Sequence, residues 1–185
     1  SLDAANELLA DYPEKLQALL PQLESLRRRL AARGWEVRPG EPLKVTLCPK
    51  GYGYTGSEVA AALESGGIYP EFYDTDHVVL MVSPQNDPAE LRRLEEVLAA
   101  LPRRQAIRQG PPPMPRLEQA VTPHEAMLSP WEEVPLAACC GRISAAGALG
   151  CPPAVPVVLC GQRIDAAAVE VLRYYGFRRC AVLTE

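Results

Sequence analysis

The sequence is short of residue types on which many enzymes depend. Its 185 residues include two histidines, His77 and His124, and three lysines, Lys15, Lys44 and Lys50. A lysine acts in Schiff-base chemistry where burial lowers its pKa, and none of the three lies in an apolar strand-to-loop context. Neither histidine has a partner at catalytic spacing, so we interpret both as structural or surface residues. The residues by themselves therefore show no catalytic machinery.

Long apolar segments and an excess of positive charge are also missing. No apolar run approaches the ~20 residues of a membrane span. The first residues are acidic and helix-like rather than a secretory signal, so we expect a cytoplasmic protein. The formal net charge is −4, and no global positive field exists to attract phosphate groups. This argues against nucleic-acid and anionic-membrane partners.

The cysteines contain no C-x-x-C pair, the close spacing that zinc ligands usually have. All of them stand in apolar sequence, and we interpret them as small buried hydrophobic residues in a reducing compartment. Metal ligation and disulfide bonding are the less favoured alternatives for this set: Cys48, Cys139, Cys140, Cys151, Cys160 and Cys180.

The first 108 residues carry the pattern of one compact α/β unit. Hydrophobic residues make up 48% of the chain, which is enough to bury a core. Leucines recur at three- and four-residue spacing from residue 8 to residue 30, which predicts an amphipathic helix that Pro13 and Pro21 bend or divide. Alternation over 43–47 predicts a half-buried strand. Further expected elements are a helix after the GYGYTG loop, strands at 68–73 and 77–83, and a helix from Pro88 to about Ala100 capped by Asp87.

A proline-rich linker and a second, smaller unit follow. Residues 109–116, QGPPPMPR, are expected to be stiff and extended, and residues 117–185 then form the second unit. Its pattern predicts a short helix after Thr122, with proline at the first position and glutamate at the third. Residues 151–156, CPPAVP, must run extended because of their prolines, and Val155 to Leu159 suits a buried strand. Asp165 is the predicted cap of a helix over 166–175 that Gly176 closes.

Few segments invite a functional interpretation from chemistry alone. The GYGYTG loop suits a phosphate site, but it lacks the P-loop lysine and dinucleotide spacing, so a turn with a helix cap at Thr55 or Ser57 is favoured. The acidic pair Glu132–Glu133 suits either a cleft for a cationic substrate or a solvated strand end. Arg142 is flanked by apolar residues and is expected to form a fixed fork to a carboxylate or to carbonyl groups.

Two segments nevertheless resemble one known family. Residues 44–87, KVTLCPKGYGYTGSEVAAALESGGIYPEFYDTDHVVLMVSPQND, are similar to the small domain of the bacterial ornithine/lysine/arginine decarboxylases. Residues 121–164, VTPHEAMLSPWEEVPLAACCGRISAAGALGCPPAVPVVLCGQRI, are similar to that family's C-terminal domain, with its "VPL…A-GRI-A" and "PPG-P…PGE-I" patterns. The departures are Ala146 in place of a frequent acid, and Ala154 and Gln162 in place of the glycine and glutamate.

The resemblance implies an α/β (α+β) fold: the small domain of an aminotransferase-like, fold type I enzyme over 1–108, the linker 109–116, and the family's C-terminal domain over 117–185. In that family pyridoxal phosphate is held by an upstream large domain, whose Ser-x-His-Lys pattern is absent here. The chain is therefore expected to bind no cofactor alone, to be inactive alone, and to close the active-site mouth of a homodimeric parent enzyme. The cleft contacts expected on this basis are Tyr54, Thr55, Glu132, Glu133 and Arg142.

Two functional hypotheses follow from the resemblance, and a third stands beside them. The chain is either a non-catalytic part of a basic amino-acid decarboxylase, which converts arginine, lysine or ornithine to the amine and CO2, or a stand-alone regulatory or interaction module derived from these domains. An independent metal- or thiol-dependent enzyme is the third, and it requires a reactive cysteine.

Overall fold

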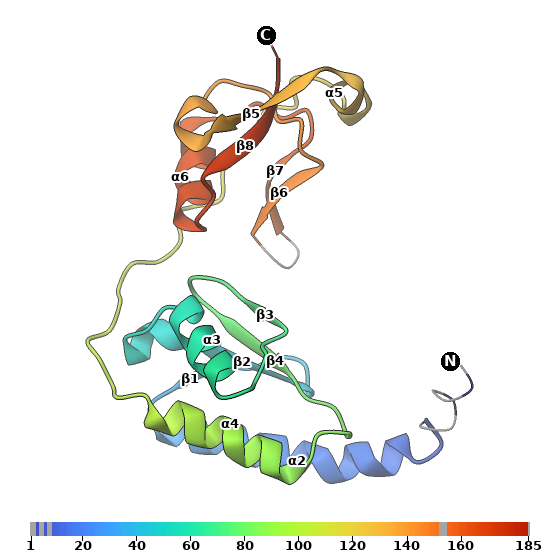
Figure 1. The fold of residues 1–185 in the computed structure, drawn as a ribbon, viewed down its shortest axis with the longest axis vertical. Coiled ribbons are helices and arrows are strands. Elements are labelled where there is room, and N and C mark those ends of the chain that lie inside the picture. Colours follow the sequence, from blue (N-terminus) through green and yellow to red (C-terminus); the bar gives the residue numbers. More distant parts are fainter. Residues whose placement is uncertain (1–2, 4–5, 7–8, 152–154, 185) are drawn as a thin grey trace. The chain divides into compact units, whose positions relative to one another are not determined.

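The computed structural model describes residues 3, 6, 9–151 and 155–184, with the side chains of 148–151 left aside. The chain divides into two compact units, residues 1–108 and 109–185. Each unit combines helices with antiparallel strands around its own hydrophobic core: the N-terminal unit has one four-stranded sheet, and the C-terminal unit has two two-stranded sheets (Figure 1). The predicted mixed α/β class is confirmed.

The N-terminal unit is a four-stranded antiparallel sheet with helices packed on it. Its strands lie in the order β1-β2-β4-β3, and the elements in chain order are α2 (Tyr12–Ala32), β1 (Glu36–Arg38), β2 (Lys44–Cys48), the 3₁₀ turn η1 (Pro49–Tyr52), α3 (Gly56–Ser65), β3 (Phe72–Tyr73), β4 (Val78–Met81) and α4 (Pro88–Ala100). The helices α2 and α4 run side by side (Figure 1).

The register of the two central strands decides which side chains enter the core. Val45 of β2 is opposite Leu80 of β4, and Leu47 is opposite Val78. All four are buried together with leucines of the helices. Side chains alternate across a strand, so Met81 points to the other face, where 53% of it is exposed. The sheet therefore buries one face and leaves the second partly open.

Helix α2 shows where the two prolines lie in the predicted helical region. Pro13 lies in its first turn, but Pro21 lies inside a helix that continues to Ala32, so the chain is not divided there. A proline inside a helix removes one backbone hydrogen bond. Buried leucines on both sides of Pro21, such as Leu19 and Leu23, hold the helix against the core and offset this loss.

The C-terminal unit has more strands than its sequence predicted. It contains α5 (Pro123–Leu128), β5 (Trp131–Pro135), the 3₁₀ turn η2 (Leu136–Ala138), β6 (Ala148–Cys151), β7 (Val155–Leu159), α6 (Ala166–Tyr174) and β8 (Arg179–Leu183). The pairs β5–β8 and β6–β7 are antiparallel. Strands β6 and β8 were not anticipated, and for β5 the sequence offered only a strand end at Glu132–Glu133 as one of two interpretations. Residues 152–154 of the predicted extended segment lie outside the described residues.

The GRIS segment runs through the middle of this unit. Ile143 accepts a backbone hydrogen bond from Leu183 of β8, and Ser144 donates one to Gln162. The segment thereby joins β8 on one side to residues 161–164 on the other. This explains in physical terms why the GRI and GQRI parts of the sequence pattern occur together: they are neighbours in space.

Candidate functional site

Tyr54, a predicted cleft residue, is part of the core of the N-terminal unit. Its side chain is 2% exposed, and its hydroxyl donates to the carbonyl oxygen of Pro102 at 2.8 Å. The guanidinium of Arg104 lies 4.0 Å from the ring centroid. These contacts attach the segment after α4 to the η1 turn, which is a structural role. A role of Tyr54 in substrate contact stays a prediction.

Thr55 forms the N-terminal cap of α3. Its Oγ1 accepts from the N–H of Glu58 at 3.3 Å, and the Glu58 carboxylate accepts from the Thr55 N–H at 2.8 Å. This reciprocal capping box satisfies two donors at the helix start. The N–H of Thr55, with help from its hydroxyl and from Arg104, holds the pKa of Glu58 below its usual range against the effect of burial.

The glycine-rich loop packs against protein rather than forming an open cradle. A Cβ at Gly56 would lie 2.2 Å from the carbonyl oxygen of Asp74 and 2.3 Å from that of His77. The Gly56 N–H already donates to Thr75 at 3.1 Å. The loop is therefore a close contact between the start of α3 and the β3–β4 turn, and the cap interpretation favoured by the sequence is confirmed.

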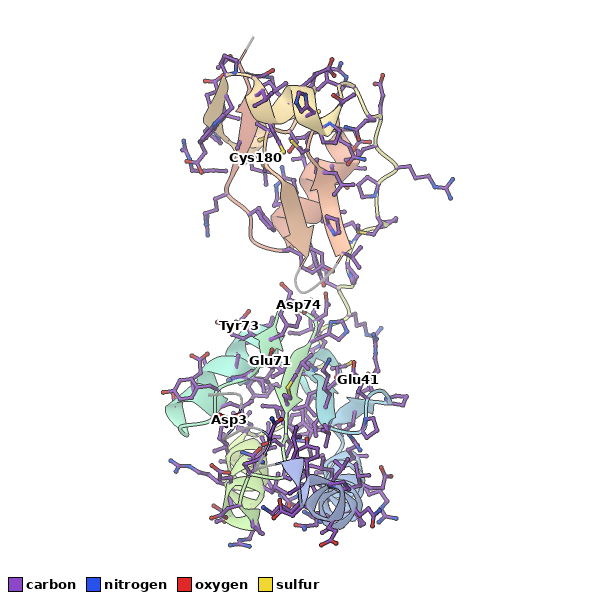
Figure 2. All side chains as sticks on the ribbon, turned by 90° about the vertical axis from the view of Figure 1, so that its right-hand side faces the viewer. Asp3, Glu41, Glu71, Tyr73, Asp74 and Cys180 are labelled. Atoms are coloured by element: carbon purple, nitrogen blue, oxygen red, sulfur yellow. The ribbon has the colours of Figure 1, made fainter. Side chains whose placement is uncertain are left out.

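Sequence reasoning missed an ion pair beside this loop. The Lys50 ammonium lies 2.6 Å from the Asp76 carboxylate, and their side chains are 13% and 10% exposed. In the same turn, Asp74 accepts from the N–H groups of Asp76 and His77 and lies 3.4 Å from the His77 ring (Figure 2). Burial raises the pKa of Asp74, but these hydrogen bonds outweigh it, so the pKa lies below its usual range. The sequence signal that could have revealed this cluster was the pair Asp74 and Asp76, two residues apart in a predicted turn.

Glu132 and Arg142 are brought together in the C-terminal unit. The Arg142 Nη2 donates to the Glu132 carboxylate at 2.8 Å and to the carbonyl oxygen of Leu183 at 2.6 Å. This confirms the expected fork to a carboxylate and a carbonyl. The Arg142 side chain is 19% exposed and that of Glu132 is 49% exposed, so the pair ties β5 to β8 and leaves carboxylate surface open to solvent.

The edge of β5 that does not pair with β8 carries the backbone groups of Glu133, and the Arg179 side chain contacts Glu133 there. Pro130 and Leu136 form backbone hydrogen bonds on the β8 side. Hydrogen-bonded and non-hydrogen-bonded residues alternate along an antiparallel strand, so the N–H and C=O of Glu133 point away from β8. Arg179 donates to both the carboxylate and the carbonyl oxygen of Glu133 at 2.8 Å. Pro135 has no N–H to offer. Charged groups and proline on an edge strand discourage pairing with another chain.

Four of the five cysteines whose side chains are described follow the sequence interpretation, and the side chain of Cys151 lies outside the description. Cys48, Cys139, Cys160 and Cys180 are buried free thiols, but Cys140 is exposed. Cys140 follows the η2 turn, where the chain returns to the surface, so the expectation of burial was wrong at this position. Burial, with help from the adjacent Cys139 thiol, raises the pKa of Cys180 to about 12 (Figure 2). Within the described residues, no group of three His, Cys, Asp or Glu side chains is arranged to hold a metal ion.

Comparison with known proteins identifies the C-terminal unit. Residues 103–181 match the family "Orn/Lys/Arg decarboxylase, C-terminal domain". The resemblance to this decarboxylase family is confirmed. An arginine decarboxylase of Bacillus subtilis is 28% identical over 133 residues, which are 67% of this chain and 27% of that protein. The chain therefore spans about a quarter of this decarboxylase.

Solved decarboxylase structures share the fold. A lysine decarboxylase of Francisella novicida matches with a TM-score of 0.64 and 15% identity, covering 92% of this chain and 40% of that one. The constitutive lysine decarboxylase of E. coli matches with a TM-score of 0.60 and 18% identity, covering 92% and 41%. At this identity the likeness concerns the fold alone.

In the described part of the chain no helix is long and apolar enough to cross a membrane.

Proposed function

We propose that this chain is a non-catalytic C-terminal portion of a pyridoxal-phosphate-dependent decarboxylase of basic amino acids. The observation that carries the proposal is the family match over residues 103–181, in a chain that spans 27% of an arginine decarboxylase and 40% of a lysine decarboxylase. The reaction converts arginine, lysine or ornithine to the amine and CO2. The upstream cofactor-binding domain of the same protein is the main partner, and the parent is a homodimer.

The lysines of the chain do not fit a pyridoxal-phosphate site. When bound, this cofactor serves as an electron sink for the carbanion, and it needs a lysine amine that is free to form a Schiff base. Lys15 pairs with Asp11, Lys44 with Glu41, and Lys50 with Asp76. Each of the three amines is thus engaged in an ion pair within this chain. We therefore assign no chemical step with the cofactor to this chain.

The role that remains is to shape the entrance to a cleft in the parent enzyme. The half-exposed carboxylate of Glu132, fixed by Arg142, suits the cationic end of a basic amino acid. Glu133, Tyr54 and Thr55 complete the proposed contacts. A cytoplasmic location is part of the proposal, supported by the free state of the five cysteines whose surroundings are described.

Two measurements test this function. The purified 185-residue chain, incubated with pyridoxal phosphate and arginine, lysine or ornithine, is expected to release no CO2 and to show no cofactor on lysine after borohydride reduction and mass spectrometry. Sequencing the DNA upstream of the Ser1 codon is expected to show an open reading frame that encodes Ser-x-His-Lys. Turnover by the chain alone, or a start codon next to Ser1, overturns the proposal.

A stand-alone interaction module is the second candidate. The observation that favours it is a group of large exposed apolar side chains on α5 and β5: Met127 is 67%, Leu128 74% and Trp131 60% exposed. Exposed apolar groups of this kind often mark protein contacts. Light scattering combined with affinity capture separates the two candidates, because a stoichiometric partner other than a decarboxylase domain supports the module.

A further inference from the structure

A pocket of about 310 Å³ lies in the N-terminal unit, away from every residue assigned above. It is formed where β4 ends, where α4 begins, and by the segment after α3. Its apolar lining includes core side chains, each at most 9% exposed: Leu80, Val82, Leu91 and Leu94. Pockets for small ligands begin at about 300 Å³ and combine an apolar lining with a few polar groups. The size therefore suits a small molecule.

Two opposite charges of α4 line the same pocket. Glu90 and Arg93 are three residues apart on the helix, a spacing that places side chains side by side. Glu90 accepts from the Asp87 N–H and the Asn86 amide through Oε2, and its Oε1 takes part in none of the hydrogen bonds found among the described residues. The two charges are not paired with each other in the described part of the chain.

The Arg93 guanidinium is positioned over a glycine. A Cβ at Gly67 would lie 3.3 Å from Arg93 Nη2 and 3.6 Å from its Cζ, and Gly67 has φ +77°. The positive φ favours glycine at this position, and the absence of a side chain leaves room for the guanidinium. Among the described residues no carboxylate or carbonyl accepts from Arg93, so its donors are available at the rim of the pocket.

The rim also carries large apolar side chains that are exposed to solvent. Tyr69 is 79% exposed and Met81 is 53% exposed, and both line the pocket. A ligand with an apolar part would remove these side chains from water as it enters, which favours binding. The α4 N-terminus itself is already capped by Asp87 and Glu90, so Arg93 is the group left to receive an anion.

We propose that this pocket binds a free α-amino acid with an apolar side chain. The ligand carboxylate pairs with the Arg93 guanidinium, the ammonium pairs with Oε1 of Glu90, and the side chain enters the space over Leu80 and Leu94. Charge complementarity selects this occupant, because a molecule with adjacent positive and negative groups matches a Glu–Arg pair. The inference does not depend on the proposed function.

The test is an NMR titration of the ¹⁵N-labelled 185-residue chain with L-leucine. Amide shifts are expected in residues 67–69, 80–82 and 86–94, with roughly millimolar affinity for so small a ligand. Isoamylamine, which lacks the carboxylate, and 4-methylpentanoate, which lacks the amine, are expected to bind at least about tenfold more weakly. L-Lysine, with its charged end, is also expected to bind more weakly. No shifts at these amides, or equal binding of all four compounds, overturns the proposal.

Variants separate the two charge contacts. Arg93→Gln is expected to weaken leucine binding and leave isoamylamine unchanged, whereas Glu90→Gln, which can still cap α4, is expected to weaken leucine and isoamylamine but not 4-methylpentanoate. Arg92→Gln changes the neighbouring exposed arginine, which does not line this pocket, and serves as the matched control. Equal losses in the Arg92 and Arg93 variants contradict the assignment. The ligand comparisons on the unaltered chain decide the question if a variant fails to fold.

Discussion

At the scale of single residues, Ser144 is the least expected feature of the C-terminal unit. It is fully buried in the GRIS segment, and its hydroxyl has no hydrogen-bond partner in the described structure. A buried polar group without a partner costs about 1–3 kcal/mol. The Ser144 N–H donates to Gln162 and its carbonyl oxygen accepts from Gly161, so the cost belongs to the hydroxyl alone.

Ser144→Ala is therefore expected to raise the free energy of unfolding by about 1 kcal/mol, because it removes the unpaired hydroxyl and leaves only a small void. Urea denaturation followed by circular dichroism measures the change. Ser65→Ala, at an exposed serine whose hydroxyl donates to Ala61, is the control and should change stability little. A clear loss of stability in Ser144→Ala would show that the hydroxyl has a partner.

Asp74 gives a pH dependence with a definite sign. Its pKa is lowered in the folded chain, so its charged form stabilises the fold above the unfolded pKa of about 4, and this contribution is lost as the pH falls through the folded pKa. Asp74→Asn should be less stable than the parent chain at pH 6, and the difference should shrink toward pH 2. A difference that stays constant over this range contradicts the assignment.

The cysteines should differ strongly in reactivity. The thiolate is the reactive form, and Cys180 combines burial with a pKa of about 12, whereas Cys140 is exposed. Iodoacetamide at neutral pH followed by peptide mass spectrometry should modify Cys140 well before Cys48, Cys139, Cys160 and Cys180. Rapid native labelling of a buried thiol would revive the hypothesis of a thiol-dependent enzyme.

At the scale of elements, local signals predicted the helices better than the strands. Asp87, Thr122 and Asp165 were identified as caps from the sequence, and each accepts from its own helix. A cap depends on residues within one turn, so the sequence displays it directly. Strand β5 contains two glutamates and two residues exposed at its ends, and its pairing with β8 joins segments about 50 residues apart, which no local pattern shows.

The candidate site was predictable in part for the same reason. The apolar neighbours of Arg142 indicated a fixed fork, and the structure has it. The partner of Glu133 could not be read from the sequence, because Arg179 is distant in the chain and comes close only when β8 pairs with β5. The pair Lys50–Asp76 was missed because it joins two turns.

Thr122 tests the capping argument. Thr122→Ala removes a side chain that accepts from the Glu125 N–H and donates to its carboxylate, so we expect a loss of about 1 kcal/mol in the stability of the C-terminal unit. Urea denaturation measures the loss. Ser57→Ala, at an exposed position in the first turn of α3, should stay within about 0.5 kcal/mol of the parent chain. Equal effects of the two changes would argue against the cap.

At the scale of the whole molecule, the two cores are separate. The N-terminal core and the C-terminal core share no residue, and residues 102–118 between them contain no helix or strand. The backbone of Arg104 and Ile107 is bonded to the N-terminal unit, and Arg108 and Arg116 are the exposed arginines that lie beyond these hydrogen bonds.

Brief trypsin digestion should therefore cut first after Arg108 or Arg116 and leave two protease-resistant fragments, because cleavage needs backbone that can leave its hydrogen bonds. Mass spectrometry of the early products identifies the sites. Early cleavage inside β2 or α6 would contradict the division into two units, while resistance of the connection would show that it is held by further contacts.

The side chain of Arg179 over the edge of β5 also bears on how this polypeptide behaves when crowded. An uncovered strand edge offers a template on which further molecules can add, end after end, into a growing ribbon. Here a guanidinium and a proline occupy the edge of β5, which makes it a poor template for such growth.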